Sequence, residues 1–139
     1  MTVDGLDDDT IRRVLAETRR IAVVGASPRP TRPSHGVFAF LVARGYDVTG
    51  VNPGIAGQTL HGRPVVASVD GAAPIDMVDV FRRSAEVAPV VDDAIRLGAK
   101  VVWMQLGVID EAAAERARAE GMTVVMDRCP VIEVRRLGL

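Results

Sequence analysis

The side chains best suited to binding a ligand gather in one segment, residues 25–36, which reads GASPRPTRPSHG. It contains Arg29 and Arg32, and a guanidinium group binds phosphate through two parallel hydrogen bonds. Its hydroxyl groups belong to Ser27, Thr31 and Ser34. Three prolines limit the conformational entropy that the loop loses when a ligand orders it. The segment therefore indicates a site for a phosphorylated ligand; the alternative is a surface loop whose arginines are solvated.

This loop follows an apolar run, residues 21–25, and precedes a helical pattern over residues 35–44. Strand, loop and helix in that order are typical of the start of a nucleotide-binding sheet, and a helix N-terminus capped by Ser34 favours an anion. Of the dinucleotide fingerprint G-x-G-x-x-G, only the first glycine, Gly25, is present. The acidic residue that holds the ribose of NAD is absent, because the next strand ends in VNPG. A ligand with an extra phosphate is therefore favoured, and an NAD(P)-type nucleotide-binding protein is an alternative.

Strand and helix patterns alternate along the chain. Apolar runs predict strands at residues 21–25, 47–52, 76–81, 100–106 and 123–126, with a weaker one at 65–67. Helical patterns cover residues 7–19, 35–44, 84–97 and 110–121, with Asp7 and Asp110 as N-caps, and residues 131–134 are expected to add an edge strand or arm. Repeated strand-helix-strand units predict an α/β fold with a single doubly wound parallel sheet, Rossmann-like, in one domain over residues 1–139.

In such a sheet, ligands bind beyond the carboxyl ends of the strands, at the point where the winding reverses. The candidate binding residues are therefore those that follow each strand. After the later strands these residues are Asn52, Arg82, Arg83, Gln105, Gly107 and Cys129. The segments around Asn52 and from Gln105 to Gly107 are also typical of ordinary turns, and this structural interpretation stays open.

The composition argues against several other classes of function. Seventeen basic and 18 acidic residues give a formal net charge of −1, which provides no general field for nucleic acid or an anionic membrane. One cysteine allows no internal disulfide, and no metal-ligand cluster is evident. The acidic N-terminus has no apolar signal segment, and no apolar run approaches transmembrane length. We therefore expect a cytoplasmic protein that binds neither nucleic acid, membrane nor metal.

Six short motifs, in their order and spacing, carry a family resemblance. They are VGAS at 24–27, RPS at 32–34, GVNP at 50–53, DVFR at 79–82, VVWMQLG at 101–107 and MDRCP at 126–130. On these motifs the chain resembles the small single-domain CoA-binding proteins, whose Rossmann-like domain is similar to the N-terminal domain of the succinyl-CoA synthetase alpha subunit. The resemblance covers nearly the whole chain and implies binding of coenzyme A or an acyl-CoA.

The resemblance also implies roles for individual residues. The phosphates of coenzyme A would meet Gly25, Ala26, Ser27, Arg29, Arg32 and Ser34. The adenosine side would be lined by Val51, Asn52 and Pro53, and the other side of the ligand by Phe81, Arg82 and Arg83. Apart from the resemblance, the position of Gln105 and Gly107 after a strand makes them candidates to meet the pantetheine arm or thiol end. The family often has a lysine or arginine soon after the Asn-Pro pair, whereas residues 54–58 read GIAGQ. An arginine of the first loop is therefore expected to meet the 3′-phosphate.

Catalytic groups are not evident in the sequence. It offers no Ser-His-Asp set, paired carboxylates or P-loop, and the phosphorylated histidine of succinyl-CoA synthetase belongs to a second domain that this chain lacks. His35 is expected to orient the loop or stay solvated, and Asp79 to be paired or near the sheet edge of the site. We expect non-catalytic binding; the alternative is a subunit or relic of an acyl-CoA ligase that needs an unidentified protein partner.

Two further expectations concern the C-terminal part of the chain. Cys129 stands beside Arg128, and a neighbouring arginine favours the thiolate, so one hypothesis is a mixed disulfide between Cys129 and the thiol of coenzyme A. The alternative, which we favour, is an inert and partly buried cysteine. The apolar stretch at residues 131–134 is a candidate edge for a homodimer.

Overall fold

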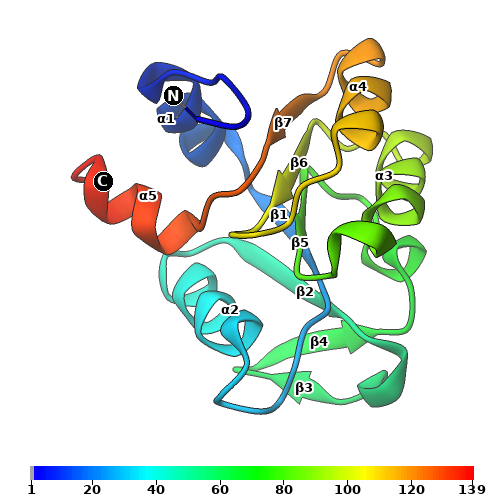
Figure 1. The fold of residues 1–139 in the computed structure, drawn as a ribbon. Coiled ribbons are helices and arrows are strands. Elements are labelled where there is room, and N and C mark those ends of the chain that lie inside the picture. Colours follow the sequence, from blue (N-terminus) through cyan, green and yellow to red (C-terminus); the bar gives the residue numbers. More distant parts are fainter. Residues whose placement is uncertain (1) are drawn as a thin grey trace.

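The apolar runs of the sequence form a seven-stranded sheet, and α-helices pack on both of its faces (Figure 1). The computed structural model describes residues 2–139. The strands are β1 (Arg20–Val24), β2 (Asp47–Val51), β3 (Thr59–Leu60), β4 (Arg63–Val66), β5 (Met77–Val80), β6 (Val101–Met104) and β7 (Thr123–Val125). The α-helices are α1 (Asp8–Glu17), α2 (Pro33–Ala43), α3 (Val87–Arg96), α4 (Glu111–Ala119) and α5 (Pro130–Arg136).

The order of the strands across the sheet is β3-β4-β2-β1-β5-β6-β7. All neighbouring strands are parallel except β3, which is antiparallel to β4 and lies in a segment that the sequence predicted as a loop. The first strand, β1, lies in the middle of the sheet. The next parallel strands, β2 and β4, are added on one side of it, and the chain then crosses over to add β5, β6 and β7 on the other side. The winding therefore reverses between β1 and β5, which confirms the predicted doubly wound, Rossmann-like sheet.

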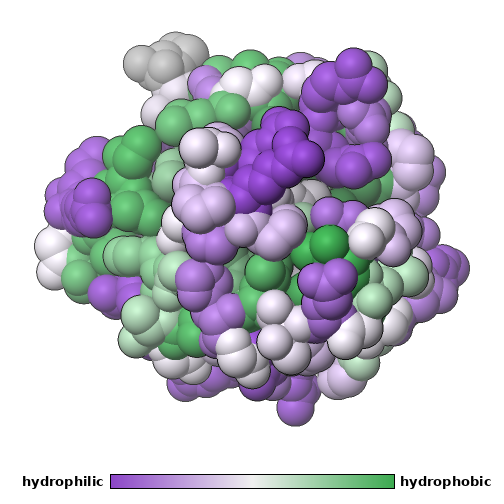
Figure 2. All heavy atoms as spheres, turned by 90° about the horizontal axis from the view of Figure 1, so that it is seen from below, coloured by the Kyte–Doolittle hydropathy of each residue, from purple (hydrophilic) through white to green (hydrophobic). Residues whose placement is uncertain are grey.

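Alternate residues of each strand point to opposite faces, and each face has its own helices. On one face Ile21, Met77 and Trp103 pack with α1, α2 and α5. On the other face Val78 and Met104 pack with α3 and α4. Figure 1 shows these two groups of helices on opposite sides of the sheet. On the face seen from below, hydrophilic and hydrophobic residues are interspersed (Figure 2).

The two predicted N-caps are confirmed. The side chain of Asp7 accepts a hydrogen bond of 2.9 Å from the N–H of Thr10, and that of Asp110 accepts one of 3.0 Å from the N–H of Ala113. Each bond pairs a donor that the first helical turn would otherwise leave free. These two helix starts are thus encoded within four residues of sequence.

The start of α2 differs from the prediction. The helix begins at Pro33, and its N-cap is Arg32, whose side chain makes no capping hydrogen bond. Proline suits the first helical position because its φ is already near the helical value and it has no N–H to leave unpaired. Ser34 therefore lies inside the first turn, where it is buried, and it is not the cap.

The prediction of an edge strand at residues 131–134 was wrong, because these residues belong to α5. Periodicity alone does not distinguish so short an apolar run in a strand from one in a helix. The buried carboxylate of Glu133 accepts hydrogen bonds from Arg128, just before the helix, at 2.6 Å and from Arg136 of the same helix at 2.9 Å. The strand edge on which a homodimer was predicted is therefore not formed.

Candidate functional site

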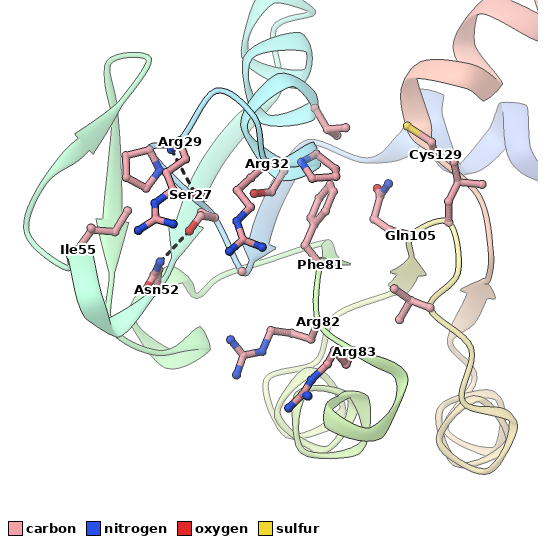
Figure 3. Close-up of a pocket in the computed structure, with 18 of the residues that line it drawn as sticks. Ser27, Arg29, Arg32, Asn52, Ile55, Phe81, Arg82, Arg83, Gln105 and Cys129 are labelled. Atoms are coloured by element: carbon pink, nitrogen blue, oxygen red, sulfur yellow. Dashed lines mark hydrogen bonds between the residues drawn. The ribbon is translucent and has the colours of Figure 1, made fainter.

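A cavity of about 820 Å³ opens at the carboxyl ends of the strands, across the point where the winding reverses (Figure 3). Its walls come from the loops after β1, β2, β5 and β6 and from the segment after β7. The residues predicted from the sequence that line it are Gly25, Ala26, Ser27, Arg29, Arg32, Ser34, Asn52, Phe81, Arg82, Arg83, Gln105 and Cys129. The fold therefore brings together residues from five separate segments of the chain.

Gly25 makes the close approach of β1, β2 and β5 at the cavity possible. Its φ is +90°, and a Cβ atom added there would lie 2.5 Å from the carbonyl oxygen of Phe81. The N–H of Gly25 donates to the carbonyl of Val51 at 3.0 Å, and the N–H of Phe81 donates to that of Val24 at 2.8 Å. Both the backbone conformation and the space therefore require glycine at this position.

Two side chains brace the loop that follows Gly25. The Asn52 amide donates to the carbonyl of Ala26 at 2.8 Å, and its oxygen accepts from the N–H of Gly54 at 2.8 Å. Nδ1 of His35 lies 3.0 Å from the carbonyl oxygen of Ser27. His35 thus contacts the loop, as the sequence suggested, and Asn52 joins the ends of β1 and β2.

The arginines of the cavity fall into two pairs (Figure 3). Arg29 and Arg32 come from the loop after β1, are exposed, and form no ion pair within residues 2–139. Arg82 and Arg83, across the opening, share the carboxylate of Glu86 at 2.9 and 2.7 Å. Because Glu86 partly neutralises the second pair, Arg29 and Arg32 are the arginines most available to an anionic ligand.

Three predicted site residues do not line the cavity. Val51 is buried and packs toward the α3 and α4 face of the sheet. Pro53 is exposed at the start of a 3₁₀ turn. Gly107 lies in a turn outside the cavity wall. Its N–H donates to the Asp127 carboxylate at 2.7 Å, and its carbonyl accepts from the Ser84 hydroxyl at 3.3 Å. The cavity thus uses fewer residues after β2 and β6 than the sequence predicted.

Apolar residues that the sequence analysis did not select complete the walls. They are Pro28, Pro33, Val37, Ile55, Leu106 and Val108, together with the backbone of Gly54. Ile55 lies in the segment after Asn52, where the sequence analysis considered only a cation. Its position four residues beyond Val51, the last residue of β2, was the available signal.

The end of the cavity beside β6 and β7, opposite Asn52 and Ile55, is formed by Gln105 and Cys129 (Figure 3). Gln105 is 6% exposed and Cys129 is 9% exposed. We call this region the β6–β7 end. It is more enclosed than the arginine-bearing opening, so a ligand group placed there would be largely removed from water.

Arg128 does not support a thiolate at Cys129 as the sequence suggested. Its buried guanidinium donates to the carboxylate of Asp4 at 2.8 and 2.9 Å, to Glu133 at 2.6 Å and to the carbonyl of Leu6 at 3.0 Å. This network joins the N-terminal segment and α5 to the end of β7. The positive charge is therefore compensated by two carboxylates, which leaves the inert interpretation of the thiol favoured.

The Asp4 carboxylate is held in its charged form by this network. Burial raises the pKa of Asp4, but hydrogen bonds from Arg128 and from the N–H groups of Leu6 and Met126 outweigh that effect, so the pKa lies below its usual value. The same balance holds for Glu133. Burial raises its pKa, but hydrogen bonds from Arg136 and Arg128 outweigh that effect, so the pKa of Glu133 also lies below its usual value.

Asp79 has no partner among the described residues, so the expectation that it is paired was wrong. It is the third of the four residues of β5, close to the carboxyl edge of the sheet where the cavity opens, and it is fully buried opposite Val23 of β1 and Trp103 of β6. Neither carboxyl oxygen has a hydrogen-bond partner among the described residues. Burial therefore raises the pKa of Asp79 well above its usual value, which favours the neutral form of the side chain in the folded protein.

Residues 2–139 contain neither a cluster that would hold a metal ion nor a helix that would cross a membrane. No three side chains of His, Cys, Asp or Glu come together in that range in a way that would hold a metal ion. None of the helices in it has the length and apolar character needed to cross a bilayer.

Comparison with known proteins adds a family and several relatives. A family model described as a CoA binding domain matches residues 19–135. An uncharacterized protein of Bacillus subtilis (strain 168), YneT, is 39% identical over 119 residues, which cover 86% of this chain and 87% of that protein. A hypothetical protein from Pyrococcus horikoshii OT3 has a TM-score of 0.93 at 38% identity, covering 100% of this chain and 97% of that one. A Thermus thermophilus structure, cell-free ID.343, has a TM-score of 0.88 at 35% identity, covering 95% and 99%.

Proposed function

This chain belongs to the CoA binding domain family, and we propose that it binds coenzyme A or an acyl-CoA in the cavity at the strand ends. In this proposal the protein acts in the cytoplasm and catalyses no reaction of its own. The observation that carries the proposal is the pair Arg29 and Arg32, which form no ion pair within residues 2–139 and lie where the winding of the sheet reverses. Unpaired guanidinium groups beside a cavity favour a ligand with several phosphates.

The residues present fit coenzyme A along the length of the cavity. Arg29 and Arg32 would hold the phosphates. One of the two would bind the 3′-phosphate, because residues 54–58 carry no cation. Ile55 and Asn52 would line the adenosine side, since both stand at the β2 end. The pantetheine arm would then run past Phe81 toward β6.

The side chains that line the cavity are suited to binding rather than to bond breaking. They offer guanidinium, amide and hydroxyl groups, the thiol of Cys129 and apolar walls. Of the two histidines, His35 lies against the backbone of Ser27, and His61 contacts His35 with ring centroids 4.7 Å apart. Neither histidine lines the cavity, so neither is placed to act as a general base there.

Thermal unfolding with a ligand series tests the proposal. CoA, acetyl-CoA, dephospho-CoA, NAD, NADP and ATP are each added in excess, and the shift in Tm is measured. CoA at about 100 times its Kd raises the free energy of unfolding by about 2.7 kcal/mol if it binds only the folded state. Stabilisation by NAD, with none by CoA or acetyl-CoA, would overturn the proposal.

A further inference from the structure

A second cavity, of about 470 Å³, lies beside the β6–β7 end of the first cavity. Its walls come from residues 2–8, the turn after β6, the segment after β7 and α5, and we call it the α5 cavity. Leu106 and Cys129 line both cavities, so the two adjoin at these residues. A ligand that reaches Cys129 in the first cavity can therefore extend into the α5 cavity.

The charged side chains that line the α5 cavity already have partners within the protein. Arg136 donates to Asp8 at 2.8 Å and to Glu133 at 2.9 Å. Arg128 is compensated by the network described above, and the Asp127 carboxylate accepts a hydrogen bond of 2.7 Å from a backbone N–H. Because these charges are satisfied, the cavity offers little to a phosphate or another ionic group.

The remaining walls of the α5 cavity are apolar and exposed. Among residues 2–139, five large hydrophobic side chains are exposed, and three of them line this cavity: Val3 at 43%, Leu106 at 57% and Ile132 at 50%. Single exposed hydrophobic residues are ordinary, but several gathered in one hollow mark a binding surface. The α5 cavity is therefore suited to an apolar group.

We propose that the α5 cavity holds the acyl chain of an acyl-CoA, so that the protein prefers aliphatic thioesters to free coenzyme A. The inference rests on the proposed function and narrows its ligand to thioesters with a chain longer than acetyl. The chain would cover Val3, Leu106 and Ile132, and removing their apolar surface from water is favourable. The proposal concerns binding alone, so no bond forms or breaks.

The position of the α5 cavity relative to the arginines favours a group of the ligand over a protein partner. Figure 3 shows Cys129 at the start of α5, on the opposite side of the first cavity from Arg29. With the phosphates at Arg29 and Arg32, the sulfur of coenzyme A lies toward Cys129, and in a thioester the acyl chain comes next. The chain thus begins where the two cavities adjoin.

The test measures affinity against the length of the acyl chain. CoA, acetyl-CoA, butyryl-CoA, hexanoyl-CoA and octanoyl-CoA are titrated into the wild-type protein by calorimetry. A methylene group that is fully removed from water strengthens binding by about fourfold. Because the walls of the α5 cavity are partly exposed, we expect a smaller total gain, with octanoyl-CoA binding about 10- to 100-fold more tightly than acetyl-CoA.

Variants place the acyl chain within the molecule. Ile132→Gln makes one wall of the α5 cavity polar while keeping a good helix former in α5, and it should reduce the ratio of octanoyl-CoA to acetyl-CoA affinity by about threefold to tenfold. Val3→Gln repeats the test from the N-terminal segment should the change in α5 lower Tm. Ile109→Gln is the matched control, since Ile109 is exposed and lines neither cavity.

The outcomes distinguish this inference from the proposed function. If the wild type binds none of the five ligands, the proposed function itself fails. Equal affinity for acetyl-CoA and octanoyl-CoA overturns the inference and leaves CoA binding intact, and a ligand-free dimer in sedimentation that Ile132→Gln dissociates would then assign this face to a second copy. A dependence on chain length that survives in both Ile132→Gln and Val3→Gln also overturns it. A dependence that these two variants reduce and Ile109→Gln retains supports it.

Discussion

Replacing the buried acid of β5 by its neutral isostere, Asp79→Asn, is expected to remove a pH dependence of stability. In the folded protein Asp79 is fully buried between Val23 and Trp103, neither carboxyl oxygen has a partner, and burial raises its pKa well above the usual value. In the unfolded chain the same group has an ordinary pKa near 3.8. The folded state therefore retains a proton that the unfolded state has released.

The sign and the size follow from proton linkage. Between the unfolded-state and folded-state pKa values of Asp79, unfolding releases one proton, so the free energy of unfolding falls as the pH rises. The slope is about 1.4 kcal/mol per pH unit, or about 2.7 kcal/mol from pH 5 to pH 7 while Asp79 stays protonated in the fold. The carboxyls of lowered pKa, such as Asp4 and Glu133, act in the opposite direction and only at lower pH.

The assay is urea unfolding followed by circular dichroism at pH 5, 6 and 7. We expect Asp79→Asn to lose the decline in stability that the wild type shows over this range. Asp79→Val also removes the unpaired oxygens and is expected to be about 1–3 kcal/mol more stable than the wild type at pH 7. Asp9→Asn, an exposed control in α1, should keep the wild-type slope. Parallel slopes for the wild type and Asp79→Asn would refute the reasoning, because Asp79 would then be charged in the folded protein.

Three further predictions concern the cavity and the segments around it. Arg32→Ala should weaken CoA by about 10- to 100-fold in calorimetry, whereas Arg135→Ala, an exposed change outside the cavity, should not. A larger loss for CoA than for dephospho-CoA assigns Arg32 to the 3′-phosphate, an equal loss assigns it to the diphosphate, and no loss contradicts the phosphate role. Asp4→Ala leaves the buried Arg128 partly uncompensated and should reduce the free energy of unfolding by about 3 kcal/mol at pH 7. Because the folded-state pKa of Asp4 is lowered, the carboxylate stabilises the fold at pH values above its unfolded-state pKa. This stabilisation is lost as the pH falls through the folded-state pKa, and an acid unfolding profile that is unchanged in Asp4→Ala would contradict this. Cys129, without a free cation beside it, is expected to react slowly with CoA disulfide, and rapid formation of a CoA adduct in mass spectrometry would revive the mixed-disulfide hypothesis.

Local patterns in the sequence were sufficient for the order and type of most elements. The buried strands are continuous apolar runs, and the helices that start at Asp7 and Asp110 are capped by those residues within the first turn. The loop with Arg29 and Arg32 was located because it follows the first strand directly. Each of these features depends on residues close together in the chain.

The errors have two different sources. Residues 131–134 are too short an apolar run for periodicity to distinguish a strand from a helix, and they belong to α5. The charge of Arg128 was not available to Cys129 because Asp4, 124 positions earlier, pairs with it. No local pattern contains that partner.

The sequence by itself determined a doubly wound sheet, its alternation of strands and helices, and a cationic loop at the switch point. It did so because periodicity and loop composition are properties of short segments. Only the tertiary structure decided which polar groups are satisfied. The burial of Asp79, the pairing of Arg128 and the unpaired amide of Gln105 depend on which strands lie side by side, and that neighbourhood exists only in the folded chain.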